Sequence, residues 1–186
     1  MNTQGDSPPR PLLIAALVVA VGAIVAVLVV AVVLQRPTAP TPIVVAAVPA
    51  PHAEGPECRA LTAALPERLG EYSRAPLLEP APPGTAAWQA QDDSEALILR
   101  CGLDRPLEFV VGAPIQGVDA VQWFKVADEN MRDEADVGRS TWFAVDRPVY
   151  VALTLPAGSG PTPIQAISTA ISETLPPTPI DPGPAQ

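Results

Sequence analysis

A run of 23 residues without a charged, amide or hydroxyl side chain covers residues 12–34. A helix of this length is about 35 Å long, slightly more than the roughly 30 Å hydrocarbon core of a bilayer. Because backbone groups in that core have no water to bind, a single segment that crosses it has to be helical. Buried helices of globular proteins rarely run this far without one polar position. The sequence therefore predicts a single transmembrane helix over residues 12–34.

The cysteines indicate on which side of this span the rest of the chain lies. One arginine lies close to each end of the apolar run, so the positive-inside rule alone barely decides its orientation. Cys58 and Cys101 are the two cysteines, and both follow the span in one small domain, which indicates an oxidising compartment. We therefore expect a single-pass protein of the cell membrane, with residues 1–11 in the cytoplasm and the C-terminal domain outside it.

A cleaved signal peptide is the alternative to a retained anchor. The apolar region of a secretory signal usually has about 7–15 residues, far fewer than this run. Small-residue sites such as Val45-Ala46-Ala47 lie well beyond the end of the run. We therefore expect the N-terminal segment to be retained as an anchor.

Proline divides the remainder into folded and unfolded parts. The chain has 25 prolines in 186 residues, against an average usage of about 5%. Residues 35–56 hold six of them and show no sustained helical or alternating hydrophobic pattern. This composition favours an extended, semi-rigid linker, and a short strand at Ile43-Val44-Val45 is the alternative. Residues 177–186 are again rich in proline, and we expect this tail to be disordered. The folded domain is therefore predicted over residues 57–176.

Hydrophobic periodicity predicts an α+β domain over this stretch. Apolar residues recur at helical spacing at both ends of the domain and alternate between them. The segment over residues 118–126 fits a strand less cleanly, and a helix is its alternative. The expected elements are a helix that starts at Pro56 and ends before Pro66, strands over residues 95–100, 107–111 and 118–126, a hairpin over residues 139–145 and 148–155, and a helix over residues 162–175. We expect a small, mostly antiparallel sheet of three or four strands with two flanking helices.

Two polar stretches are interpreted as loops. Residues 71–93 contain four prolines and one large anchor, Trp88, which we expect at the edge of the core rather than in a ligand site. Residues 128–136 carry five acids, but not at the spacing of a calcium loop, so we expect a solvated hairpin tip and no metal site.

The two cysteines both fall on apolar stripes, Cys58 on the first helix and Cys101 on a strand. A bridge between them closes a loop of about 43 residues, which is worth roughly 4 kcal/mol in the chain-entropy model. Two free thiols or a redox pair are the alternatives. The chain has no Cys-x-x-Cys, and no His or Lys beside either cysteine to lower its pKa, so we expect a structural disulfide.

Composition argues against several classes of function. Residues 57–176 hold 17 acidic and 9 basic residues, a net charge of −8, which disfavours binding to nucleic acid. The single histidine, His52, lies in the linker, so the domain lacks the commonest general base and metal ligand. None of its serines has a histidine to activate it, and glycine-rich phosphate loops are missing. We therefore expect no enzyme, no catalytic residue, no cofactor and no metal.

Several short strings together resemble one known family. They are EC-x-x-L-x-x-ALP at residues 57–66, LRCG at 99–102, GVDAVQWF at 117–124, VDRPVYV at 145–151 and a closing helix that ends in Leu-Pro. In this order they look like the actinobacterial domain-of-unknown-function family 3515, over about residues 57–176 and in the layout of anchor plus domain. The resemblance implies an envelope protein with Cys58 and Cys101 paired. It supplies no activity and no catalytic residues.

The expected function is that of a membrane-anchored, extracytoplasmic accessory or interaction domain of the bacterial cell envelope, with another envelope protein as its partner. Trp123, Phe124, Trp142 and Phe143 are the candidate contact surface, since neighbouring strand positions point one ring inward and one outward. Burial of these rings in the core is the alternative. A carrier for a small ligand or lipid is the competing function, which a cavity of about 300 Å³ or more with convergent polar groups would favour.

Overall fold

The computed structural model describes residues 10–34, 41–90, 95–126 and 138–185. The chain divides into two compact units, Met1–Pro40 and Thr41–Gln186. Each unit is described by itself below. The acidic segment over residues 128–136, for which we expected a solvated hairpin tip, lies outside the described residues.

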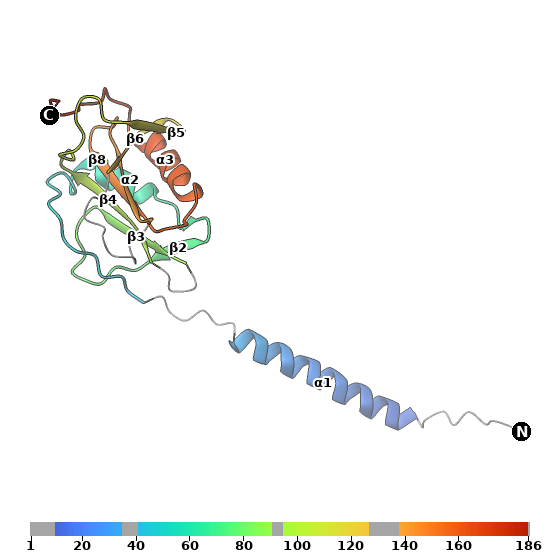
Figure 1. The fold of residues 1–186 in the computed structure, drawn as a ribbon. Coiled ribbons are helices and arrows are strands. Elements are labelled where there is room, and N and C mark those ends of the chain that lie inside the picture. Colours follow the sequence, from blue (N-terminus) through green and yellow to red (C-terminus); the bar gives the residue numbers. More distant parts are fainter. Residues whose placement is uncertain (1–9, 35–40, 91–94, 127–137, 186) are drawn as a thin grey trace, which may run out of the picture. The chain divides into compact units, whose positions relative to one another are not determined.

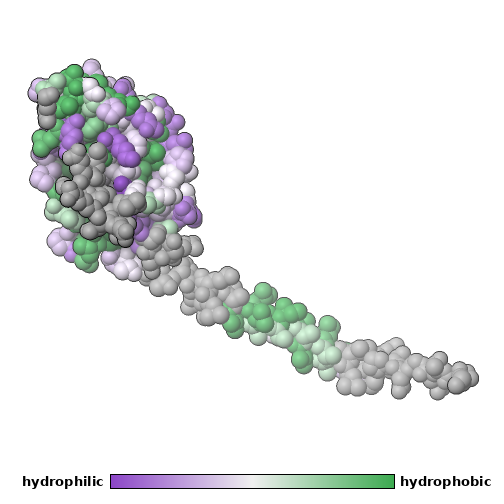
Figure 2. Space-filling model, in the orientation of Figure 1, coloured by the Kyte–Doolittle hydropathy of each residue, from purple (hydrophilic) through white to green (hydrophobic). Residues whose placement is uncertain are grey.

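The first unit contains one helix, α1 (Arg10–Leu34), which Figures 1 and 2 show as a single helix that is hydrophobic along its described side chains. A helix is therefore confirmed where one was predicted. Its apolar side chains are described over residues 14–30, about 26 Å of helix against a bilayer core of roughly 30 Å. Within the described part of the chain, no helix is both long enough and apolar enough to cross a membrane. This finding corrects the predicted transmembrane helix over residues 12–34.

The second unit is built on one eight-stranded antiparallel sheet, with strand order β1-β2-β3-β4-β8-β7-β6-β5. Figure 1 labels β2, β3, β4, β8, β6 and β5 of this sheet. The expectation of a small sheet with three or four strands is wrong. The sheet consists of two four-stranded meanders, which meet where β4 pairs with β8. The strands are β1 (Arg68–Leu69), β2 (Tyr72–Ala75), β3 (Thr85–Gln89), β4 (Leu97–Leu103), β5 (Ile115–Val118), β6 (Val121–Val126), β7 (Ser140–Ala144) and β8 (Tyr150–Leu155).

The additional strands lie in segments whose sequence patterns are weak. β2 and β3 fall inside the stretch of residues 71–93 that was expected to be a loop. They are short, rich in small and polar residues and flanked by prolines, so neither shows a clear alternation. The single strand expected over residues 118–126 is instead part of a hairpin, because Asp119 adopts φ 51° and reverses the chain between β5 and β6.

Two helices complete the domain, α2 (Pro56–Ala64) and α3 (Thr162–Thr174), and both agree closely with the predicted helices. They pack against each other and cover one face of the sheet. Their apolar stripes meet the strand residues of this face in the main core, where Trp88 and Trp123 are fully buried. Trp88, which we expected at the edge of the core, is instead fully buried within it, on β3. The Trp123 indole Nε1 donates a hydrogen bond of 2.9 Å to Ser168 Oγ on α3.

The predicted disulfide is present between Cys58 of α2 and Cys101 of β4, with the two Cα atoms 5.6 Å apart. Both residues have no solvent exposure. The covalent bond therefore joins the helical layer to the centre of the sheet across the main core.

A second, smaller core lies on the opposite face of the sheet. Phe109, Phe124 and Val145 are buried there, and the rings of Phe109 and Phe124 are 5.3 Å apart. Phe109 comes from residues 107–111, which were predicted to be a strand. In the structure this stretch forms a covering loop with one isolated bridge at Val110. Of the apolar residues that alternate in this stretch, only Phe109 enters the second core, whereas Leu107 and Val111 are 85% and 60% exposed.

The end of the expected linker belongs to the domain. Ile43 forms an isolated bridge with Leu77, and the backbone N–H of His52 donates to Gly102 O at 3.1 Å. Gly102 has φ 85°, and a Cβ on it would lie 2.3 Å from Ala53 N. Only glycine therefore allows residues 52–53 to lie this close to β4.

Replacing Cys58 with Ser should lower the free energy of unfolding by about 2–5 kcal/mol, because the unfolded chain regains the freedom that the closed loop removes. It should also leave Cys101 free to react. Chemical denaturation and thiol labelling measure the two effects. The Cys58→Ser/Cys101→Ser double variant is the control that separates loss of the bond from the effect of a lone thiol. Labelling of both thiols in the native, non-reduced wild type would contradict the bond.

Candidate functional site

The four aromatic residues chosen as a partner surface belong largely to the two cores. Trp123 is fully buried and Phe124 is 4% exposed, so neither can contact a partner in the folded domain. Trp142 and Phe143 are partly buried and pack against the main core and the second core, respectively. The alternation of inward and outward rings is present, but both faces of the sheet are covered.

The C-terminal residues 176–185, here called the C-terminal strap, follow the surface of the domain. We expected this tail to be disordered. Instead, the backbone N–H of Thr178 donates to Asp146 O at 2.9 Å, and that of Gly183 donates to Phe109 O at 2.8 Å. Gly183 O in turn accepts from the N–H of Val111 at 2.9 Å. The strap therefore holds the loop that carries Phe109 over the second core.

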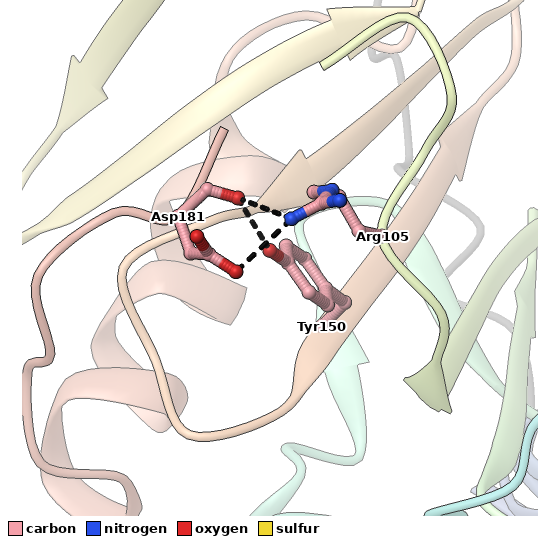
Figure 3. A network of polar contacts seen from close by, with 3 residues as sticks. All are labelled: Arg105, Tyr150 and Asp181. Atoms are coloured by element: carbon pink, nitrogen blue, oxygen red, sulfur yellow. Dashed lines mark hydrogen bonds and ion pairs between the residues drawn. The ribbon is translucent and has the colours of Figure 1, made fainter. Parts of the chain in front are cut away.

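A polar network fixes the strap at its centre (Figure 3). Arg105 Nη1 lies 3.0 Å from Asp181 Oδ2 and 3.2 Å from Asp181 O, and the Tyr150 hydroxyl donates to Asp181 O at 3.3 Å. The pKa of Tyr150 is raised above its ordinary 10.0, first by burial and then by the Asp181 carboxylate, while Arg105 acts in the opposite direction. The network links the loop after β4, the start of β8 and the strap.

A buried ion pair lies next to the strap, since one of its members, Asp146, accepts the Thr178 N–H through its backbone oxygen. Asp146 and Arg147 are 4% and 7% exposed, and Arg147 Nη1 lies 2.9 Å from Asp146 Oδ2. Arg147 Nη2 also donates to Ala120 O at 2.7 Å, which ties the pair to the turn between β5 and β6. Because charges that are removed from water need partners, these contacts fix the turn and the strap relative to β8. Asp146 and Arg147 of the Val-Asp-Arg-Pro string therefore have a structural role.

Aliphatic side chains lie exposed around the strap and the loop that it holds. Leu107 is 85% exposed and Val111 is 60% exposed, and Ile115 and Ile180 are near 36%. We call these four residues the strap patch. Figure 2 shows hydrophobic side chains at the end of the domain where Figure 1 places the C-terminus. Large apolar side chains that gather on a surface mark a contact site more often than single ones do.

A cavity of about 470 Å³ lies within this region. Its only charged side chains are Asp104 and Arg105, and Leu107 and Val110 form part of its apolar wall. The complete lining consists of Asp104, Arg105, Pro106, Leu107, Val110, Gly183, Pro184 and Ala185. Arg105 is the one cation there, and it already binds Asp181.

A second cavity, of about 780 Å³, lies beside α2. Two of its polar side chains bind nearby backbone: Arg59 Nη1 donates to Glu54 O at 2.7 Å, and Thr62 Oγ1 donates to Cys58 O at 2.7 Å. Glu54 and Arg59 are the charged residues of its wall. The described residues do not bring three or more His, Cys, Asp or Glu side chains together as metal ligands.

Replacing Asp181 with Asn should lower the pKa of Tyr150, because the carboxylate that disfavours the phenolate is removed. Arg105→Gln should raise this pKa, because the favourable cation is lost. A phenol with a raised folded pKa contributes stability that is fully present below its unfolded value of 10.0 and is lost as the pH rises through the folded pKa. Titration of the assigned Tyr150 Cζ signal by NMR measures the shifts, with Asp104→Asn as the control. An unchanged or raised pKa in Asp181→Asn would show that the strap does not lie against Tyr150 in solution.

Comparison with known proteins gives one result. A family model described as a protein of unknown function, DUF3515, matches residues 17–180. Searches of curated proteins and of solved structures give no match. Because the family model covers most of the chain, the resemblance seen in the short strings is confirmed, and the chain belongs to the DUF3515 family.

Proposed function

We propose that this chain is an accessory or interaction domain that acts outside the cytoplasm by contacting another protein of the cell envelope. The observation that carries the proposal is the strap patch of Leu107, Val111, Ile115 and Ile180. No catalytic step is part of the proposed function.

The rigid support beneath the strap patch favours a role in binding. The backbone of Val111 is bonded to Gly183, and Ile180 directly precedes Asp181, which binds Arg105 and Tyr150. An apolar surface held in this way loses little conformational freedom when a partner covers it, so more of the burial energy remains as affinity. Ile115 extends the patch to β5, an edge strand of the sheet.

The disulfide supports a location outside the cytoplasm. Structural disulfides form and persist in oxidising compartments and are rare where glutathione keeps thiols reduced. The bond between Cys58 and Cys101 lies inside the main core. The disulfide can therefore stabilise the domain only in a compartment in which thiols are oxidised.

The buried polar side chains support a role without catalysis. In the part of the chain that the structure describes, Ser168 binds Trp123 and the α3 backbone, while Asp146 and Arg147 bind each other and a turn. These contacts serve the fold, although Asp146 Oδ1 and Arg147 Nε have no hydrogen-bond partner. None pairs a nucleophile with a base, which nucleophilic catalysis requires.

A carrier function is the second candidate, and one observation favours it. The cavity of about 470 Å³ at the strap lies within the size range of small-molecule sites and has Arg105 in its wall. Because Arg105 already binds Asp181, an anionic ligand would have to replace an existing ion pair. The interaction domain needs no such exchange and is therefore preferred.

Photo-crosslinking in the cells that make the protein tests the contact surface. A photoreactive residue at position 107 or position 111 should capture the same envelope protein, identified by mass spectrometry. Leu78 is the matched control, since it is 52% exposed but lies beside Ile43, away from the strap patch. Equal products from position 78 would contradict the strap patch as the surface. Capture of only lipid or a small metabolite at position 107 would favour the carrier.

A reporter that is active only outside the cytoplasm, fused after Gln186 in the full chain, should be active. The same reporter fused to residues 41–186 alone is the control, and it should be inactive because the N-terminal segment is missing. Activity of a strictly cytoplasmic reporter on the full chain, with the extracytoplasmic one silent, would refute the proposed location.

A further inference from the structure

Arg100 is a half-buried cation for which the described residues supply no counter-charge. It lies in β4 opposite Thr85 of β3 and Ala152 of β8, on the face of the strand that points away from the main core. Its Nε is buried and makes no hydrogen bond. Burial lowers the pKa of Arg100, and no charged neighbour acts against this effect. The desolvation of this guanidinium is therefore uncompensated within the described residues.

Several other basic side chains of the domain differ from Arg100 in this respect. Arg74 lies 4.8 Å from the Trp88 ring centroid and is influenced by Glu67. The remaining examples each have a partner: Arg59 binds Glu54 O, Arg105 binds Asp181, Lys125 lies over Trp142, Arg139 binds Glu95 and Arg147 binds Asp146. Among the residues that the structure describes, Arg100 is therefore a half-buried cation that no carboxylate is seen to bind.

A cavity of about 170 Å³ lies directly beside Arg100. At about 30 Å³ per water molecule, it has room for a group of about five or six heavy atoms. Its wall is apolar except for Arg100 and Thr85, and consists of Ala47, Val48, Ala50, Pro82, Pro83, Thr85 and Arg100. The Thr85 hydroxyl is 3.4 Å from Pro83 O, a long contact that leaves it able to bind a ligand instead.

We propose that Arg100 and this cavity bind a carboxylate that carries a short apolar group. The guanidinium fork matches the two oxygens of a carboxylate, Thr85 offers a third donor, and the alanine, valine and proline wall suits the apolar remainder. The small volume excludes long acyl chains, and the apolar wall disfavours a fully polar anion such as phosphate. This site is separate from the strap patch and does not depend on the function proposed for that surface.

Thermal unfolding of the full chain, with the carboxylate supplied as sodium propionate, tests the proposal. Sodium chloride at matched ionic strength is the reference, and inorganic phosphate is the second anion. Propionate should raise the midpoint by about 3–6 °C for each tenfold increase above its dissociation constant. Arg100→Gln should lose this rise. Arg74→Gln, a half-buried arginine on the same sheet, is the matched control and should keep it.

A second variant covers the case in which Arg100→Gln does not fold. Val48 lines the cavity and is 41% exposed, so Val48→Glu places a carboxylate beside Arg100 within the chain. The midpoint without propionate should rise, and the response to propionate should be lost. An unchanged response to propionate in Val48→Glu or in Arg100→Gln would overturn the site, as would a response to phosphate or chloride equal to that for propionate.

A third probe, the blocked dipeptide N-acetyl-Ala-Ala, distinguishes two sources of the carboxylate, and only its C-terminal alanine has to enter the cavity. Tighter binding of this dipeptide than of propionate assigns the carboxylate to the end of a polypeptide chain. Tighter binding of propionate assigns it to a free small acid. Both results support the site, whereas failure of both probes to bind overturns it.

Discussion

The pairing of β4 with β8 is the contact on which the rest of the domain depends. Within each half of the sheet, every strand pairs with a strand that is close in sequence, but β4 and β8 are brought together from distant parts of the chain. Cys101 lies in this seam opposite Val151, and its disulfide adds α2 to the same point. One strand therefore carries the contact between the halves, the bond to the helices and, on its outer face, Arg100.

Covering the second face of the sheet explains the less regular parts of the chain. A sheet with helices on one side leaves the other side to water unless loops protect it. Here the loop with Phe109 and the C-terminal strap cover β6, β7 and β8, and residues 43–53 lie over the opposite half. The segments whose composition suggests a linker and a free tail are thus structural parts of the domain, and their prolines suit extended chains that lie flat on a surface.

Strong periodicity made part of this fold predictable. The apolar stripes of α2 and α3 and the alternation in β4 and β8 identify elements that bury one face, so their positions and the cysteine pairing follow from the sequence. β2 and β3 escape prediction because they are short and show no clear alternation, although Tyr72 and Trp88 on them are buried in the main core. The position of the strap is not predicted from the sequence either, because Arg105 and Asp181 are 76 positions apart and neither shows a local signal. The interpretation of Trp123 and Phe124 as a contact surface assumes that one face of the sheet is exposed to solvent. Both faces are covered, so both rings are buried.

The position of Cys101 has a consequence for the order in which the domain assembles. A chain that enters an oxidising compartment from its N-terminus presents Cys58 and Cys101 there before residues 150–155 arrive. The first meander and α2 can then be joined covalently while one edge of β4 still lacks its partner. An unpaired edge with Leu99 and Cys101 on it is a template for pairing with other chains until β8 arrives. The interval between the arrival of Leu103 and that of Leu155 is therefore a period in which the chain is exposed to misassembly.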